Sequence, residues 1–141
     1  KASDIPADVA MKALPDLLAE ADGVSLHVTR DRELGVLIGR KELLMMKRGS
    51  YLVNTARGFL VDETALLDAL ATGHLAGAAL DVFEAEPYTG ALARLPNVLC
   101  TPHIASLTRA SRAAMEWRCA RNVVACFSTS PEAALGQSRR P

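Results

Sequence analysis

Side chains suited to acid–base chemistry and anion binding follow three apolar runs of this 141-residue sequence. The runs are Tyr51–Asn54, Ala78–Phe83 and Val98–Thr101. The polar groups at or just beyond their ends are a guanidinium, three carboxylates and an imidazole: Arg57, Asp81, Glu84, Glu86 and His103. If the runs are parallel strands, their carboxyl ends share one edge of a sheet, where such sheets bind ligands.

Together these groups suit the reduction of a 2-keto acid. A carboxylate hydrogen-bonded to an imidazole fixes the tautomer of the ring and favours its protonated form, which makes a proton donor and acceptor near neutral pH. An arginine holds a substrate carboxylate through two parallel hydrogen bonds, which a lysine cannot do. The imidazolium would protonate the carbonyl oxygen while a hydride arrives from a cofactor, a group that the residues themselves do not supply.

Each of these residues also has an ordinary structural interpretation. Arg57 alone would be a solvated loop residue, His103 a hydrogen-bonded structural residue and Asp81 the cap of a turn. Glu84 and Glu86 would be an acidic loop. Complementary groups after three successive runs favour a functional edge over these alternatives.

Strand and helix patterns alternate along the chain, which indicates an α/β fold with a parallel sheet and crossover helices. The predicted strands are Val9–Ala13, Gly23–Val28, Tyr51–Asn54, Ala78–Phe83 and Val98–Thr101. The predicted helices are one near Leu14–Leu18, one over Lys41–Met46, one after Asp62 and one over Thr108–Phe127. We expect Asp62 to cap the third helix, and Gly49 and Gly73 to follow the second and third in the left-handed conformation.

Composition excludes several classes of function. Acidic and basic residues balance at 16 each, so no net charge attracts nucleic acid or an anionic membrane. No apolar run is long enough to cross a bilayer. Three scattered cysteines without a C-x-x-C pair indicate reduced thiols in a cytoplasmic protein and no metal site. The sequence begins with Lys1 rather than Met, so we interpret it as part of something longer.

Four stretches carry a resemblance to a known family: "ADGVSLHV", "MKRGSYLVNTARGFLVDETALLDAL", "GHLAGAALDVFEAEP" and "LPNVLCTPHIASLT". In this order they resemble the D-isomer-specific 2-hydroxyacid dehydrogenases, nearest to the members similar to phosphoglycerate dehydrogenase. The resemblance extends from about Leu14 to about Val124. It implies a Rossmann-type domain that binds NAD and is inserted into a substrate-binding domain.

The resemblance also implies roles for individual residues. Arg57 of "NTARG" would hold the substrate carboxylate, and His103 of "TPHIA" would donate and accept the proton. Glu86 of "EAEP" would pair with that histidine, whereas Glu84 matches no catalytic position. The residues that match cofactor-binding positions of the family are Asp4, His27, Thr55, Ala56, Arg57, Asp81, His103, Ile104, Ala105 and Ser106.

The chain departs from the family pattern in one important respect. No G-x-G-x-x-G occurs in it, and in the family that loop binds the pyrophosphate at a helix N-terminus. We therefore interpret residues 1–127 as a partial Rossmann domain without its first βα unit, and residues 128–141 as a disordered tail. We expect the chain made alone to be inactive.

Several alternatives stay open. The parent protein would be an enzyme acting on a small 2-hydroxy or 2-keto acid, or a dinucleotide sensor or co-repressor, since the family includes such members. The resemblance does not separate phosphoglycerate dehydrogenases from glyoxylate or hydroxypyruvate reductases. It leaves NADP as an alternative to NAD. It implies a homodimeric parent.

Overall fold

The computed structural model describes residues 9–28 and 35–128, so Asp4 and the loop directly after "SLHV" lie outside the described residues. The chain divides into two compact units, Lys1–His103 and Ile104–Pro141. The first unit contains strands β1 (Gly23–Leu26), β2 (Tyr51–Asn54), β3 (Gly77–Leu80) and β4 (Val98–Cys100). Its helices are α1 (Leu14–Glu20), α2 (Arg40–Met45), α3 (Glu63–Ala71) and the 3₁₀ helices η3 (Gly58–Leu60) and η4 (Ala91–Arg94).

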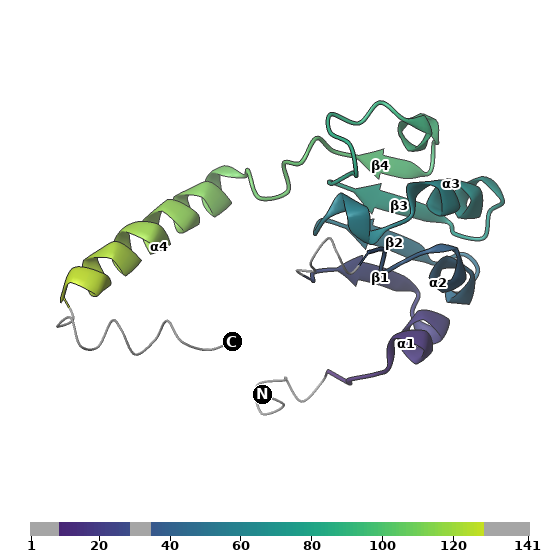
Figure 1. Cartoon of the computed structure of the whole chain (residues 1–141), viewed down its shortest axis with the longest axis horizontal. Helices are drawn as coiled ribbons and strands as arrows, with labels where there is room; N and C mark the ends of the chain where they lie inside the picture. Colours follow the sequence, from purple (N-terminus) through teal and green to yellow (C-terminus); the bar gives the residue numbers. More distant parts are fainter. Residues whose placement is uncertain (1–8, 29–34, 129–141) are drawn as a thin grey trace. The chain divides into compact units, whose positions relative to one another are not determined.

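The four strands form a parallel sheet in the order β1-β2-β3-β4 (Figure 1). Their last residues pair in one line across the sheet: Leu26, Asn54, Leu80 and Cys100. The four turns that follow therefore begin side by side at one edge. This alignment confirms the α/β class and the common edge that the apolar runs predict.

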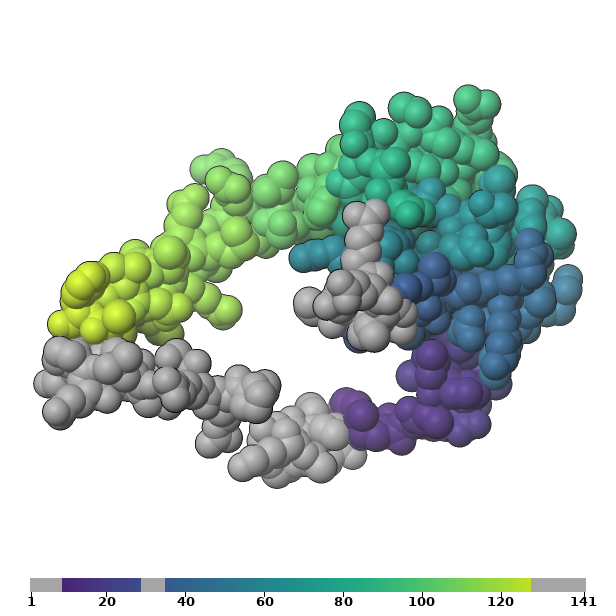
Figure 2. Space-filling view, in the orientation of Figure 1, coloured from purple at the N-terminus to yellow at the C-terminus, as the bar shows by residue number. Residues whose placement is uncertain are grey.

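Connections between successive parallel strands are right-handed, so a sheet that grows in one direction has all of its crossovers on the same face. Alternate strand residues such as Val24, Leu26 and Leu52 are accordingly buried. They join a core with fully buried leucines from the helices and loops: Leu18, Leu43, Leu66 and Leu75. In the space-filling view the blue, teal and green residues of this unit are in continuous contact (Figure 2).

The helix signals operate as predicted. The Asp62 carboxylate accepts a hydrogen bond from the Ala65 N–H at 2.9 Å and so caps α3. Gly73 has φ +67° directly after that helix. Gly49 has φ +80°, but it lies in the turn after α2, where the Ser50 N–H donates to the Lys47 carbonyl at 3.1 Å, rather than at the helix end itself.

Some predicted boundaries are wrong. Residues 9–13 form no strand; they are exposed and run directly into α1. The strand predicted over Gly23–Val28 ends at Leu26 because no strand residue pairs with Val28, which is 46% exposed. β3 begins one residue earlier than predicted and ends at Leu80, so Asp81 is the first residue of the following loop.

The second unit contains helix α4 (Arg109–Ser128), close to the predicted Thr108–Phe127. The Thr108 hydroxyl accepts the Ser111 N–H at 3.1 Å and caps its first turn. No helix within the described residues combines the length and the apolar character that crossing a membrane requires. The predicted tail begins at residue 128, but Ser128 is the last residue of α4. Residues 129–141 lie outside the described residues.

Candidate active site

The turn after β2 presents Arg57. Asn54, the last residue of β2, is 1% exposed, and its side chain closes this turn. The Asn54 amide nitrogen donates to the Arg57 carbonyl at 2.9 Å, and the amide oxygen accepts the Ala56 N–H at 3.1 Å. Arg57 itself has an extended backbone and an exposed side chain, whose Nη1 donates to the Ala56 carbonyl at 2.6 Å.

The loop after β3 is tied to both neighbouring turns by Asp81, which is 4% exposed. The Asp81 N–H donates to the Asn54 carbonyl at 3.0 Å, and the Asp81 carbonyl accepts the His103 N–H at 2.9 Å. The Asp81 carboxylate accepts a hydrogen bond from the Thr101 hydroxyl. One buried residue therefore connects the ends of β2, β3 and β4.

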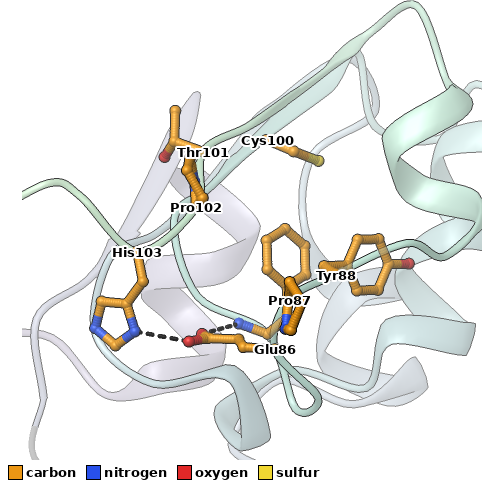
Figure 3. A pocket seen from close by; sticks show the side chains of 8 residues that line it. Glu86, Pro87, Tyr88, Cys100, Thr101, Pro102 and His103 are labelled. Atoms are coloured by element: carbon orange, nitrogen blue, oxygen red, sulfur yellow. Dashed lines mark hydrogen bonds and ion pairs between the residues drawn. The ribbon is translucent and has the colours of Figure 1, made fainter.

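Glu86 and His103 form the central pair of this edge. His103 Nδ1 lies 2.9 Å from Glu86 Oε2, and the Phe83 N–H donates to the other carboxylate oxygen at 3.0 Å. Figure 3 shows the two side chains facing each other, with Cys100 and Tyr88 further along the same cavity. The hydrogen bond from His103, followed by that from the Phe83 N–H, lowers the pKa of Glu86.

An ionised carboxylate only accepts hydrogen bonds, so Nδ1 of His103 must be the donor in this pair. This bond leaves the second ring nitrogen, Nε2, as the atom available for proton exchange with a ligand. His103 has φ +55°, a left-handed conformation that is uncommon for residues other than glycine and recurs at functional sites. The Glu86 and His103 side chains are 36% and 51% exposed, so a ligand can reach them.

Two cavities meet at this pair. The smaller, of about 300 Å³, is lined by Arg57, Glu86 and His103 together with Gly58, Phe59, Val82, Phe83 and Glu84. The larger, of about 450 Å³, shares Phe83, Glu86 and His103 but not Arg57, and is closed by Pro87, Tyr88, Cys100, Thr101 and Pro102. Only the smaller one brings a guanidinium beside the imidazole, so we assign the chemistry to it.

The other predicted site residues lie in different parts of the chain. His27 and Thr55 are exposed at the same edge, where His27 Nε2 lies 2.8 Å from the Ser25 hydroxyl. Asp4 lies outside the described residues. Ile104, Ala105 and Ser106 belong to the second unit and stay predictions. The backbone N–H of Glu84 donates to the Glu63 carboxylate at 2.8 Å.

Sequence reasoning missed two residues that build the edge, Asn54 and Gly58. A polar residue at the end of an apolar run was the available signal for Asn54, since a buried amide requires hydrogen-bond partners. Gly58 is buried, and a Cβ placed on it would lie 1.9 Å from the Phe83 carbonyl carbon. Such a contact involves residues far apart in the chain, so the sequence carries no direct signal for it.

A parallel sheet with polar side chains gathered at its carboxyl edge is the arrangement of α/β domains that bind ligands, nucleotides among them, at that edge. The chain belongs to the family described as D-isomer specific 2-hydroxyacid dehydrogenase, NAD binding domain, whose model matches residues 2–105.

Three relatives illustrate the similarity. The chain is 48% identical over 110 residues to a glyoxylate reductase from Thermococcus litoralis, covering 77% of this chain and 33% of that protein. It is 49% identical over 102 residues to a D-3-phosphoglycerate dehydrogenase from Escherichia coli, covering 68% and 25%. The NAD-complexed structure of a D-isomer specific 2-hydroxyacid dehydrogenase from Lactobacillus delbrueckii ssp. bulgaricus matches with a TM-score of 0.73 and 37% identity, over 85% of this chain and 42% of that one. The chain thus spans about a third or less of the length of the curated relatives.

Proposed function

We propose that the protein containing this chain is an NAD-dependent oxidoreductase that interconverts a D-2-hydroxy acid and its 2-keto acid. The observation that supports it most is the cavity in which Arg57 lies with the hydrogen-bonded pair of Glu86 and His103. A small keto acid has a carboxylate for the first and a carbonyl oxygen for the second. Substrates of this class match the named activities of the relatives, glyoxylate reductase and D-3-phosphoglycerate dehydrogenase.

In the reducing direction, Arg57 holds the substrate carboxylate by two charge-assisted hydrogen bonds. His103, protonated at Nε2, donates its proton to the carbonyl oxygen as that oxygen gains charge. Glu86 keeps the proton on Nδ1 and so holds the ring in the orientation that presents Nε2 to the substrate. In the oxidising direction, neutral His103 accepts the hydroxyl proton. The bound nicotinamide supplies or receives the hydride.

The residues of this chain fit one end of such a cofactor. The four strands end in register, at the edge where α/β sheets bind dinucleotides. His27, Thr55, Ala56 and Asp81 begin or follow these turns and are our candidates for contacts to the nicotinamide and its ribose. The family's pyrophosphate-binding glycine sequence is not in this chain, so that half of the cofactor must be held by residues elsewhere. Whether the ribose carries a 2′-phosphate, as in NADP, is decided in that half.

The test is turnover of the full-length protein with a reduced nicotinamide and a panel of glyoxylate, hydroxypyruvate and its phosphorylated derivative. An R57K variant should raise the KM for the keto acid roughly tenfold or more, because lysine cannot form the bidentate contact. R40K is the matched control, since Arg40 forms an exposed ion pair with Asp68. We expect no turnover from the 141-residue chain alone.

A full-length protein that binds a nicotinamide dinucleotide but reduces no 2-keto acid would contradict the proposal and favour the dinucleotide-sensing function. We further propose that the protein is a cytoplasmic homodimer, as the family resemblance implies, which sedimentation of the full-length protein can check.

A further inference from the structure

The turn between Asn54 and Gly58 is built by groups that have no part in the proposed chemistry. The Asn54 side chain is buried, and both of its polar atoms bind the backbone of this turn. Its nitrogen donates to the Arg57 carbonyl at 2.9 Å, and its oxygen accepts the Ala56 N–H at 3.1 Å. Burying an amide stabilises a protein little even when it is fully hydrogen-bonded. An apolar side chain of the same size would therefore serve the core equally well, and the amide acts on the conformation of the turn.

Gly58, which directly follows Arg57, packs this turn against the loop after β3. A Cβ on Gly58 would lie 1.9 Å from the carbonyl carbon of Phe83, 2.1 Å from its oxygen and 2.4 Å from the Glu84 nitrogen. All three are backbone atoms, so no side-chain rotation relieves the overlap. The same loop holds Glu86, because the Phe83 N–H donates to the Glu86 carboxylate.

A continuous series of hydrogen bonds and packing contacts thus runs from Arg57 to the acid–base pair. Asn54 fixes the carbonyl of Arg57, Gly58 packs on Phe83, and Phe83 orients Glu86, which in turn binds His103. The side chains of Arg57 and His103 are exposed. Arg57 Nη1 donates to the Ala56 carbonyl at 2.6 Å, so the position of the guanidinium relative to His103 follows the backbone of this turn.

We propose that Asn54 and Gly58 are positioning residues that set the separation between the Arg57 guanidinium and the Glu86–His103 pair, and so determine how well a keto acid spans the two. The inference rests on the proposed function. A misplacement of about 1 Å far from the reacting atoms can cost a reaction roughly a hundredfold in rate. An alanine at Gly58 would force a shift of at least that size.

The first test is an N54L variant of the full-length protein, which keeps the branching and the number of heavy atoms of the side chain and removes both hydrogen bonds. We expect the KM for the keto acid to rise about tenfold, because the Arg57 guanidinium is no longer held in register with His103. The KM for the reduced nicotinamide should rise less, because the candidate cofactor contacts His27 and Asp81 lie on other turns. If N54L does not fold, N54D replaces it, since it retains the oxygen that accepts the Ala56 N–H.

The matched control is N97A. The Asn97 side chain also donates to a backbone carbonyl, that of Ala76 at 3.2 Å, but at the amino edge of the sheet. N97A should lower the thermal midpoint of unfolding without changing the KM for the keto acid or for the reduced nicotinamide. A purely structural role for Asn54 predicts that N54L behaves in the same way, and that result would overturn the inference.

A double-mutant cycle makes the test sharper. If Asn54 acts through Arg57, N54L should raise the keto-acid KM much less in an R57K background than in the wild type. Effects that simply multiply would contradict the inference. G58A provides an independent variant, with a lower kcat expected because the Glu86 loop moves. If R57K and H103Q leave turnover intact, the proposed function itself is wrong. If these two variants reduce turnover while N54L and G58A do not, only the positioning inference is wrong.

Discussion

The two edges of the sheet are built differently. At the amino edge, backbone groups join the starts of neighbouring strands: the Tyr51 N–H donates to the Asp22 carbonyl at 3.1 Å, and the Ala76 N–H donates to the Ser50 carbonyl at 2.9 Å. The Asn97 side chain adds a bond to the Ala76 carbonyl at 3.2 Å. At the carboxyl edge, backbone bonds through Asp81 also join the turns. Here, however, side chains bind within and between the turns as well: Asn54 holds the turn after β2, and the Glu86–His103 pair joins the loops after β3 and β4.

This difference separates stability from function. Backbone hydrogen bonds and close packing specify where strands begin, and any sequence with suitable small residues satisfies them. Polar side chains that bind the backbone of their own turns instead fix the direction in which other side chains point. We therefore expect substitutions at the carboxyl edge to reduce turnover more than stability, and substitutions at the amino edge to do the reverse.

The largest expected effect is that of H103Q. Removing a general acid or base typically lowers the rate by about 10²–10⁴-fold, and His103 should lie near the upper end because it is the only proton donor that we assign. The measurement is kcat/KM of the full-length protein with its best keto acid. H74Q is the control, since His74 hydrogen-bonds the Leu43 carbonyl at 3.0 Å away from this edge. Equal losses in the two variants would remove the distinction between a catalytic and a structural histidine.

The next largest effect is that of E86Q. A glutamine can donate as well as accept, so it no longer enforces a proton on Nδ1 of His103, and we expect a loss of roughly 10²-fold. The pKa of Glu86 is lowered, chiefly by its hydrogen bond from His103. The wild type is therefore ionised above this lowered pKa, and titration of Glu86 itself adds no pH dependence there to the gap in turnover between wild type and variant.

The same shift determines the pH dependence of that gap. As the pH falls through the lowered pKa, the wild-type carboxyl becomes protonated and the two proteins should converge in turnover. Its contribution to stability has the same sign: it is present above the ordinary glutamate pKa of about 4.3 and is lost as the pH falls through the lowered value. A gap that does not narrow at low pH would show that Glu86 is not the group that titrates. D68N, which alters an exposed carboxylate paired with Arg40, should show neither behaviour.

At the amino edge the expected effect is on stability. A Cβ on Gly77 would lie 2.7 Å from the Asn97 carbonyl oxygen, so G77A should destabilise the protein by about 1–3 kcal/mol through overpacking, with kcat/KM per folded molecule unchanged. Gly23 is the matched control. It also begins a strand, but its nearest contact would be the Tyr51 oxygen at an ordinary 3.9 Å, so G23A should cost little in a urea melt. A loss of turnover in G77A would break the division between the edges.

The sequence predicts the fold and the two edges of the sheet only in part. Tyr51–Asn54 and the helix capped by Asp62 are identified correctly because hydrophobic periodicity and capping are local signals. The edge that carries Arg57, Glu86 and His103 follows from strand order. The brief strand over Val9–Ala13 is wrong because an apolar run forms a strand only where a partner strand exists. The contact between Gly58 and Phe83 was not predictable, because it depends on how two turns approach in space.

The smallest expected effect concerns Gly73, which has φ +67° after α3. An L-residue in that conformation costs about 1 kcal/mol, so G73A should lower the free energy of unfolding by roughly that amount. G73N should lose less, because asparagine tolerates the left-handed region better. His103 is in the same region, with φ +55°, although it is not a glycine. If alanine at Gly73 is costly, the protein accepts the same kind of strain at His103, at the edge where we place the proton transfer. An unchanged stability in G73A would mean that the left-handed conformation of His103 costs little, and would remove it as evidence for function.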